Sequence, residues 1–280
     1  MANITRRYTL AEFWTLAERE NKTQWAYIGS HGPDGGSVGY ATANYPASME
    51  LARHGWKDGA RRVMALSEKL KAAITSEMTA PGLVYDVVGD VPDVGEFMAG
   101  TPEHMLAFQE VPTTARVVRV VVGSGARASV SADSMIARGA CVCAAIDAIE
   151  SAGVRCEIVV GKATRFMRAK TEFIWEAYIT VKAADEPLNM DRLAYVLAHP
   201  SFFRRQLWQA YELENAEALA GMRNDLNSGR YGVTLDCTER GDLYIPAMVK
   251  PEDWQSPEAA KAKALAMLEK IGIKTVNGGI

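Results

Sequence analysis

Two short segments carry residue types from which a chemical site could be built. In the first, Gly123, Ser124, Gly125 and Arg127 follow a run of β-branched residues, and such a loop could present a hydroxyl nucleophile to a phosphorylated or nucleotide ligand. The second segment, GKATRFMRAK at positions 161–170, places four cations around an aromatic ring; these residues are Lys162, Arg165, Phe166, Arg168 and Lys170. They could contact phosphate or single-stranded nucleic acid, with the ring stacked on a base.

Each segment also has a plain structural interpretation. The basic segment can be a solvated loop edge with one anchoring phenylalanine. The nucleophile elbow G-x-S-x-G would require glycines where Val122 and Ala126 stand, and GSGARAS lacks the third glycine of a dinucleotide fingerprint. The four histidines have no metal-binding spacing, and Asp86, Asp90, Asp93 and Glu96 are better explained as caps and turn residues than as a Ca²⁺ loop. We therefore assign no catalytic residue, metal or cofactor.

The elements that must position both segments form a βαβ unit. The near-continuous β-branched run of residues 117–122 is typical of a strand buried on both faces of a parallel sheet. Ser131 is a predicted N-cap, an apolar stripe follows it, and Gly153 is placed to end the helix before a second strand at residues 154–160. Because the carboxyl ends of parallel strands share one edge of a sheet, the Ser124 loop and Lys162 are expected at that edge.

The remaining patterns complete a predicted α/β fold. Thr9 and Glu12 form a capping box, residues 173–181 are a predicted third strand, and residues 231–237 and 243–248 flank a turn and predict a β-hairpin. We predict a central, mostly parallel sheet with helices on both faces. The predicted regions are a mainly helical N-terminal part (1–82), an α/β core (83–213) and a C-terminal hairpin and helix (214–280).

Composition narrows the class of protein. Hydrophobic residues make up 48% of the 280 residues and charged residues 23%, and the net charge is −3. That charge gives no whole-chain argument for a nucleic-acid or membrane partner. The four cysteines include no CxxC pair, and the chain shows neither an apolar signal region nor a membrane-length run. We expect reduced thiols, a cytoplasmic location and no membrane partner.

Two family resemblances follow from these segments. The order of strand, Ser124 loop, helix and strand resembles a von Willebrand factor A domain, or more generally a Rossmann-like unit. That family binds a metal through D-x-S-x-S, but on the five positions from Val122 to Ala126 only Ser124 matches, so the resemblance implies the fold without the metal site. Four further segments are similar to a family of uncharacterised proteins of tailed bacteriophages and prophages: Ser48–Trp56, Tyr85–Met105, Ile136–Ala140 and Leu193–Arg205. The resemblance to this phage family implies no activity and no site residue.

Three functions remain open from the sequence. The first is a phage-encoded protein of the host cytoplasm that binds a host or phage protein, or assists assembly, without catalysis of its own and as a homo-oligomer. The second is a single-strand nucleic-acid accessory that uses the basic segment, with Arg204 and Arg205 as further contacts. The third is an enzyme that acts at the Ser124 loop. A structure discriminates them by what lies within hydrogen-bond range of Ser124 and by where the cations point.

Overall fold

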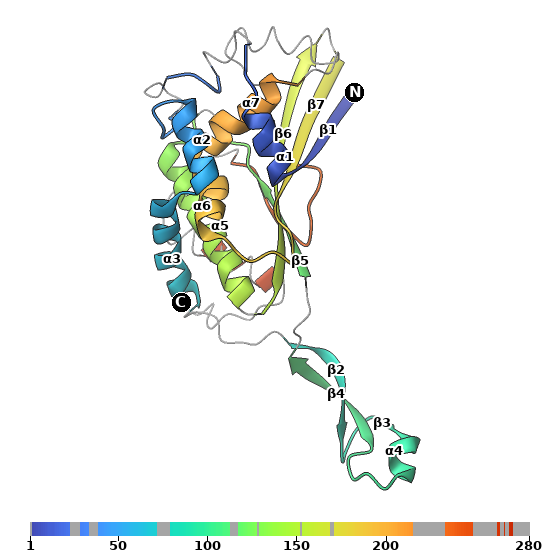
Figure 1. The fold of residues 1–280 in the computed structure, drawn as a ribbon. Coiled ribbons are helices and arrows are strands. Elements are labelled where there is room, and N and C mark those ends of the chain that lie inside the picture. The colour runs from blue at the N-terminus through green and yellow to red at the C-terminus, as the bar shows by residue number, and fades with distance from the viewer. Residues whose placement is uncertain are drawn as a thin grey trace.

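The computed structural model shows a body and a projecting arm (Figure 1). It describes residues 2–22, 29–33, 39–71, 79–112, 117–127, 129–151, 153–168, 171–214 and 233–248, together with 262–263, 266 and 269–270. The arm comprises residues 79–112, and the other described residues make up the body. Most of the helix predicted near the C-terminus, over residues 256–272, lies outside the described residues.

A mixed β-sheet forms one layer of the body. Its strands run in the order β1–β7–β6–β5–β9, and β8 pairs with the far part of β6. The strands are β1 (Ala2–Thr9), β5 (Val117–Gly123), β6 (Arg155–Arg168), β7 (Thr171–Lys182), β8 (Val233–Leu235) and β9 (Leu243–Ile245). Three of the five strand pairs are parallel, and β6 is antiparallel to β7 and β8. The predicted α/β class with a mostly parallel sheet is confirmed.

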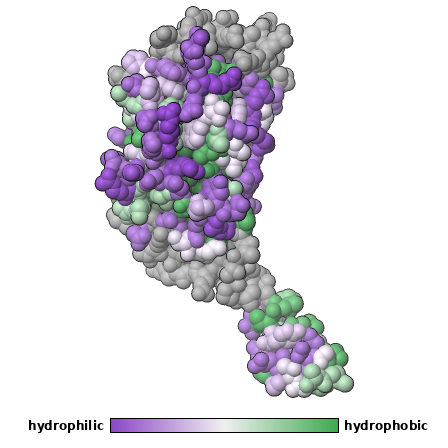
Figure 2. Space-filling view, viewed as in Figure 1, coloured by the Kyte–Doolittle hydropathy of each residue, from purple (hydrophilic) through white to green (hydrophobic). Residues whose placement is uncertain are grey.

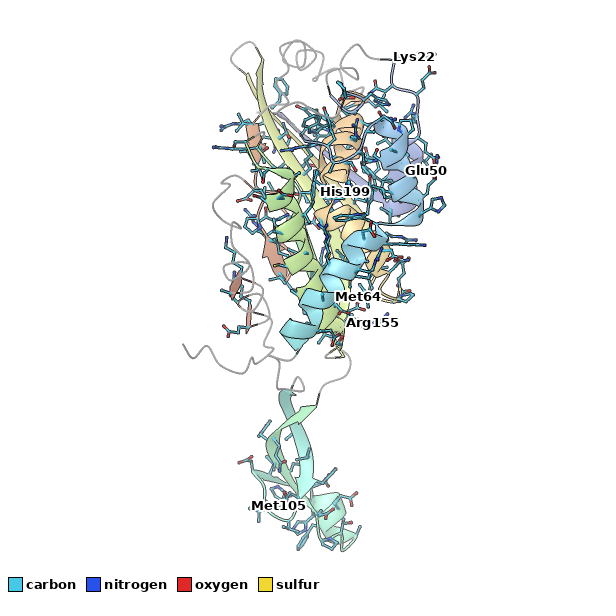
Figure 3. All side chains as sticks on the ribbon, turned by 90° about the vertical axis from the view of Figure 1, so that its left-hand side faces the viewer. Lys22, Glu50, Met64, Met105, Arg155 and His199 are labelled. Atoms are coloured by element: carbon cyan, nitrogen blue, oxygen red, sulfur yellow. The ribbon has the colours of Figure 1, made fainter. Side chains whose placement is uncertain are left out.

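The helices of the body form the second layer. They are α1 (Leu10–Ala17), α2 (Tyr45–His54), α3 (Lys57–Lys71), α5 (Ala132–Ser151), α6 (Met190–Ala198), a π-helical turn (Phe202–Gln206) and α7 (Leu207–Glu212). Figures 1 and 3 show them on one face of the sheet, with α2 and α3 outermost. Their apolar residues share one core with Val118, Val120, Ile158, Val160 and Ile179 of the sheet.

The predicted βαβ unit is confirmed. Strands β5 and β6 are parallel neighbours from Val117 opposite Arg155 to Gly123 opposite Gly161, and α5 connects them. Ser131 caps α5 by accepting a hydrogen bond at Oγ from the Ser134 backbone N–H (3.1 Å). Gly153 follows α5 with a φ of +86°, which is the left-handed conformation that favours glycine at a helix end.

Two predictions about the sheet are wrong. The helices α1 to α7 of the body do not cover both faces, because β7 follows β6 as an antiparallel neighbour and no crossover helix carries the chain to the second face. That face packs instead against the segment that carries Cys237, with Val121, Val159, Ala163 and Tyr178 beneath it. The predicted C-terminal β-hairpin is also absent, since β8 pairs with β6 and β9 pairs with β5.

The N-terminus contributes a strand that the sequence interpretation missed. Residues Ala2–Thr9 form β1, which runs parallel to β7 at the edge of the sheet. The capping box that follows is confirmed: Thr9 Oγ1 accepts from the Glu12 N–H (3.2 Å), and Glu12 Oε2 accepts from the Thr9 N–H (2.7 Å). The region predicted as mainly helical therefore also supplies one strand of the central sheet.

The arm is a small three-stranded sheet with one short helix. It consists of β2 (Thr79–Asp86), β3 (Val91–Pro92), α4 (Val94–Met98) and β4 (Met105–Pro112). Strand β4 lies between the other two and is antiparallel to both. Asp93 caps α4, in agreement with its expected role as a cap. Residues 83–112, which the sequence assigned to the core, thus extend away from it (Figure 1).

Helices α5 and α6 pack with their backbones in close contact at Gly139. A Cβ atom at this position would lie 2.2 Å from Ala198 Cα and 2.3 Å from the Leu197 carbonyl oxygen. On an exposed helix surface, replacing Gly with Ala is favourable by about 1 kcal/mol. Here we expect Gly139→Ala to lower the free energy of unfolding by about 1–3 kcal/mol, because the helices must separate.

Urea unfolding measures this change. The matched control is Ala137→Val, which adds bulk at an exposed position of the same helix and should change the free energy of unfolding by less than about 0.7 kcal/mol. A Gly139→Ala variant as stable as the parent protein would contradict the close helix contact.

Candidate functional site

The loop after β5, where a ligand was predicted to bind, lies in the interior of the body. Ser124 is buried; its backbone N–H and its Oγ both donate to the Gly161 carbonyl, at 2.7 and 2.9 Å. Among the described residues no histidine or carboxylate hydrogen bonds to Ser124 Oγ. Around it, a Cβ on Gly123 would lie 2.8 Å from Ala247 N, and one on Gly125 would lie 2.4 Å from Thr234 Cγ2. The chain around β8 and β9 therefore fills the space that a ligand would need.

Two arginines lie near this loop in different roles. Arg127, the fourth residue of the predicted loop site, is exposed, and its backbone N–H donates to the Met248 carbonyl (3.2 Å). Arg138 of α5 is buried, and its Nη2 donates to the carbonyls of Gly123 and Pro246, each at 2.8 Å. The sequence interpretation assigned no role to Arg138, which joins the loop to the end of β9.

The basic segment does not form one surface. Lys162 is buried on β6, with Nζ 5.8 Å from the centre of the Trp208 ring, and Arg165 is exposed three residues later. This follows from the two-residue period of a strand, which sends positions 162 and 165 to opposite faces. Burial lowers the pKa of Lys162 to about 7, with the Glu212 carboxylate acting in the opposite direction. Phe166 and Arg168 also lie on β6, while Lys170 falls outside the described residues.

Arg204 and Arg205 point into the body and not toward a nucleic acid. Arg205 is fully buried, and it donates to Thr42 Oγ1 and to the carbonyls of Ser30, Gly32 and Thr42, at 2.9–3.0 Å. Arg204 donates to the carbonyls of Gly39, Arg127 and Val130. These two residues stand on the π-helical turn, and they tie residues 30–32, 39–42, Arg127 and Val130 to the helical layer.

Two Ser–His pairs occur in the same region. Ser30 Oγ lies 2.9 Å from His31 Nδ1 and donates to Glu212 Oε2 at 2.5 Å. Ser201 Oγ lies 2.7 Å from His199 Nδ1, and burial lowers the pKa of His199 to about 4. Both serines have no exposed surface, so neither hydroxyl can meet a substrate. We interpret both pairs as buried polar links between loops and helices.

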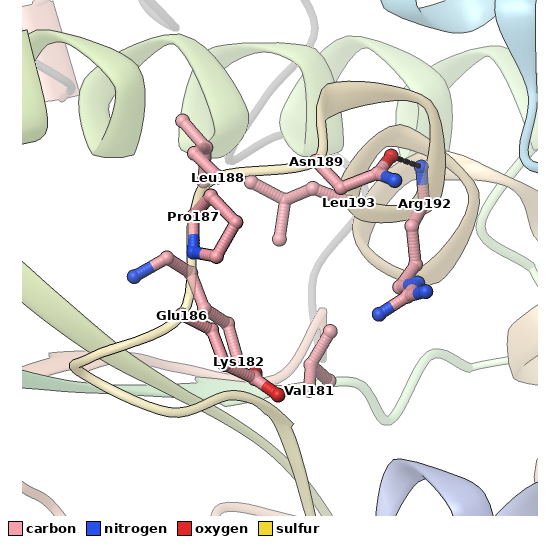
Figure 4. Close-up of a pocket in the computed structure, with 8 residues that line it drawn as sticks. All are labelled: Val181, Lys182, Glu186, Pro187, Leu188, Asn189, Arg192 and Leu193. Carbon is pink, nitrogen blue, oxygen red and sulfur yellow. Dashed lines mark hydrogen bonds between the residues drawn. The ribbon is translucent and has the colours of Figure 1, made fainter.

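A small cavity opens where β7 leads into α6 (Figure 4). It is lined by Val181, Lys182, Glu186, Pro187, Leu188, Asn189, Arg192 and Leu193, and its volume is about 180 Å³. Lys182 is already engaged by Glu150 (2.6 Å) and by the Cys156 carbonyl (2.9 Å). Since ligand pockets typically measure about 300–1,000 Å³, this cavity is small for an organic substrate.

The arm presents the largest collection of exposed apolar side chains in the described residues. Nine of the twelve large apolar side chains that are exposed lie on it: Leu83, Tyr85, Val87, Val88, Val91, Val94, Phe97, Met98 and Phe108. Figure 2 shows hydrophobic surface along the arm. No residue from 83 to 109 is buried, so within this range the arm has no core of its own. Exposed apolar side chains gathered in one segment are typical of surfaces that contact other molecules.

The arrangement of the arm gathers these side chains. In the β2–β4 register Leu83 lies opposite Phe108 and Tyr85 opposite Leu106, so the four side chains share one face of the sheet. Helix α4 adds Phe97 and Met98, which are 61% and 79% exposed. The arm therefore exposes apolar side chains from its strands and from its short helix.

Polar contacts hold the arm in shape without covering that face. Asp93 Oδ1 accepts from the Gly95 and Glu96 N–H groups, and its Oδ2 accepts from the Tyr85 hydroxyl (2.8 Å). Asp90 Oδ2 accepts from the Phe108 N–H (3.2 Å), and Asp86 Oδ1 accepts from the Val87 N–H (2.6 Å). The acidic residues that resembled a metal cluster in the sequence are thus used as turn and cap acceptors.

The arm is also strongly acidic. Residues 79–112 contain no lysine or arginine and six carboxylates: Asp86, Asp90, Asp93, Glu96, Glu103 and Glu110. The sequence interpretation placed residues 83–112 in the α/β core and missed this surface. Two features of the sequence could have revealed this surface. They are the many apolar residues of the stretch and the absence of lysine and arginine from a stretch that has six carboxylates.

Other kinds of site have less support in the described residues. No three His, Cys, Asp or Glu side chains within them converge as metal ligands would. No helix in the same part of the chain combines the length and the apolar character needed to cross a membrane.

Comparison with known proteins places the chain in a family. Searches of curated proteins and of solved structures gave no match. A family model described as a domain of unknown function, DUF7192, matches residues 8–275, which include both the body and the arm. The chain therefore belongs to the DUF7192 family.

Proposed function

We propose that the protein acts by binding another protein chain through its arm and has no catalysis of its own. One observation carries this proposal: residues 83–109 bury nothing and expose nine large apolar side chains. A three-stranded sheet without a covered face is marginally stable alone, and covering that face with a partner removes its apolar surface from water. The arm is therefore a binding element that is completed by its partner.

We further propose a bacteriophage origin and action in the host cytoplasm. The support is the similarity of four segments to proteins of tailed phages, one of which, Tyr85–Met105, makes up most of the arm. The proposed partner is a host or phage protein. A nucleic-acid role has weaker support, because Lys162, Arg204 and Arg205 are buried and Arg165 is the one cation of the basic segment described as exposed.

Site-specific photo-crosslinking in producing cells, followed by nuclease treatment and mass spectrometry, tests this function. A photoreactive residue at Phe97 or Phe108 should give nuclease-resistant protein adducts, whereas one at Val233, which is 47% exposed on β8, should not. The triple variant Phe97→Ser, Met98→Ser and Phe108→Ser should capture about tenfold less partner, because aromatic anchors dominate most interfaces.

The control for that variant replaces exposed apolar residues of the body, as Val117→Ser with Val233→Ser, and should leave capture unchanged. Adducts that vanish with nuclease would shift the function to nucleic-acid binding. An arm that yields no protein adduct would overturn the proposal.

A further inference from the structure

The charges of this chain are unevenly distributed between two segments. The arm holds six carboxylates and no lysine or arginine. Residues 45–71, which form α2 and α3, hold six basic and three acidic residues: Arg53, Lys57, Arg61, Arg62, Lys69 and Lys71 against Glu50, Asp58 and Glu68. Residues 1–44 are balanced, with four of each sign, and residues 113–280 are nearly so, with 21 basic and 20 acidic residues. The strongest opposite charges thus lie on the arm and on α2–α3.

The basic side of α3 combines cations with an exposed apolar side chain. Lys57 and Arg62 are exposed, and neither forms an ion pair or a side-chain hydrogen bond within the described part of the chain. Met64, 56% exposed, lies two positions beyond Arg62. Arg61 is paired with Asp58 one turn earlier. Met64 lies three positions after Arg61 and seven after Lys57, which places these three residues on one side of the helix, and Glu68 follows Met64 by one turn.

The arm does not cover this side of its own body. Viewed from the helical face, Met64 lies on α3 and Met105 lies on the arm well below it (Figure 3). Figure 1 likewise shows the arm extending away from α3, and Figure 2 shows hydrophilic side chains gathered on the side of the body where α3 lies. Both surfaces therefore stay exposed in a single copy.

We propose that the arm of one copy docks against α3 of a second copy, with the arm's apolar side chains covering Met64 and its carboxylates facing Lys57 on the same side of the helix and Arg62 across its exposed surface. This inference rests on the proposed function, because it names the partner of the same arm. Complementary charge supports the choice of a second copy, since the acidic arm with its apolar side chains and a helix that carries more cations than carboxylates and an exposed methionine belong to the same sequence.

The geometry of such a contact has a consequence for assembly. The arm and α3 are different surfaces, so the contact is head-to-tail and each copy offers one of each. Copies joined in this way form a ring if the rotation closes and an open chain if it does not. Charge pairs at an exposed contact weaken with salt, so association should become weaker as ionic strength rises.

Charge exchange tests the docking directly, with sedimentation velocity as the readout. The arm variant carries Glu96→Lys and Glu103→Lys, and the helix variant carries Lys57→Glu and Arg62→Glu. Each alone should self-associate at least about tenfold more weakly than the parent protein, because like charges then meet. A mixture of the two, or one chain with all four changes, should recover association. Arg19→Glu with Arg127→Glu, which reverses two exposed cations away from α3, is the control and should change nothing.

Each result supports or overturns the inference. Self-association that is unaffected by either pair of changes, or that the mixture does not restore, would overturn docking of the arm on α3. A parent protein that stays monomeric while the arm still crosslinks to a different protein would overturn this inference and leave the proposed function standing. A monomeric protein whose arm crosslinks to nothing would overturn both.

Discussion

Replacing Arg205 with methionine is expected to lower the free energy of unfolding by about 3–5 kcal/mol, one of the largest effects of any single change in this protein. The guanidinium is fully buried and donates to four acceptors on residues 30–42, while its plane lies 4.1 Å from the centre of the Tyr40 ring. Methionine keeps most of the apolar stem and supplies no donor. Each carbonyl left buried without a partner costs about 1–3 kcal/mol, and partial rearrangement of the loop recovers some of that loss.

Two further variants distinguish the loss of the Arg205 hydrogen-bond network from the loss of a positive charge alone. Arg205→Lys keeps the charge but cannot reproduce the planar fork, so it should lose about half or more of the stability that methionine loses. Arg53→Met removes an exposed arginine that pairs with Glu18 and Glu50, and it should cost less than about 1 kcal/mol. Urea unfolding of the three variants gives the comparison. Equal losses for Arg205→Met and Arg53→Met would contradict a special role for the buried network.

The part of the fold that the sequence predicted best is the part with local signals. The run of β-branched residues before Gly123, the N-cap at Ser131 and the glycine at position 153 lie within one continuous stretch, and each acts on its immediate neighbours. The capping box at Thr9 and the N-cap at Asp93 are local features of the same kind. Such features depend on hydrogen bonds over three or four residues, so the sequence alone determines them.

Strand pairing was predicted poorly because the partner of a strand is a tertiary property. The turn before β9 is real, since Gly241 has a φ of +62°. However, this turn packs on β5: the Asp242 N–H donates to the Arg119 carbonyl (2.9 Å), and Asp242 Oδ2 accepts from the Arg119 N–H (2.7 Å). The flanking strands therefore join β6 and β5 instead of each other. A turn sequence shows where the chain reverses direction. It does not show which strands the two flanking segments pair with.

The same distinction explains the candidate sites. Ser124 directly follows β5 as predicted, but the sequence could not show that the chain around Thr234 and Ala247 fills the space beside it. Lys162 was predicted at the end of a strand but lies within β6, which continues to Arg168. The arm was missed for the opposite reason. Apolar residues such as Leu83 and Phe108 look the same in a sequence whether they are buried or exposed, and only the three-dimensional arrangement shows that nothing in the described chain covers them.

Replacing Lys162 with methionine is expected to stabilise the protein by about 2–4 kcal/mol at pH 6 and by progressively less at higher pH. Burial lowers the pKa of this lysine from 10.5 to about 7 in the folded state, where Arg204 also disfavours the charge and Glu212 favours it. Below pH 7 the folded protein must carry a buried ammonium group beside Trp208. Methionine fills similar space without that charge, and the lost cation–π contact offsets part of the gain.

The sign of the pH dependence follows from proton binding. Between about pH 7 and pH 10 the unfolded chain keeps the Lys162 proton while the folded chain has released it, so unfolding takes up a proton. The free energy of unfolding of the parent protein then rises by up to about 1.4 kcal/mol per pH unit from this residue. The Lys162→Met variant lacks this pH-dependent contribution to the free energy of unfolding. Its advantage should therefore be full below pH 7 and should shrink between pH 7.5 and pH 9.

Comparing the two proteins at each pH isolates this residue, because the cysteines and tyrosines that also titrate at high pH are common to both. Urea unfolding at pH 6, 7, 8 and 9 provides the measurement. Arg127→Met is the control, since it removes an exposed cation near the end of the neighbouring strand β5, and its difference from the parent should stay within about 0.5 kcal/mol at every pH. A constant gap for Lys162→Met, or a variant less stable than the parent at pH 6, would mean that the folded protein holds Lys162 as a stable cation. That result would return Lys162 to the set of residues able to bind an anion, which its burial beside Arg204 now argues against.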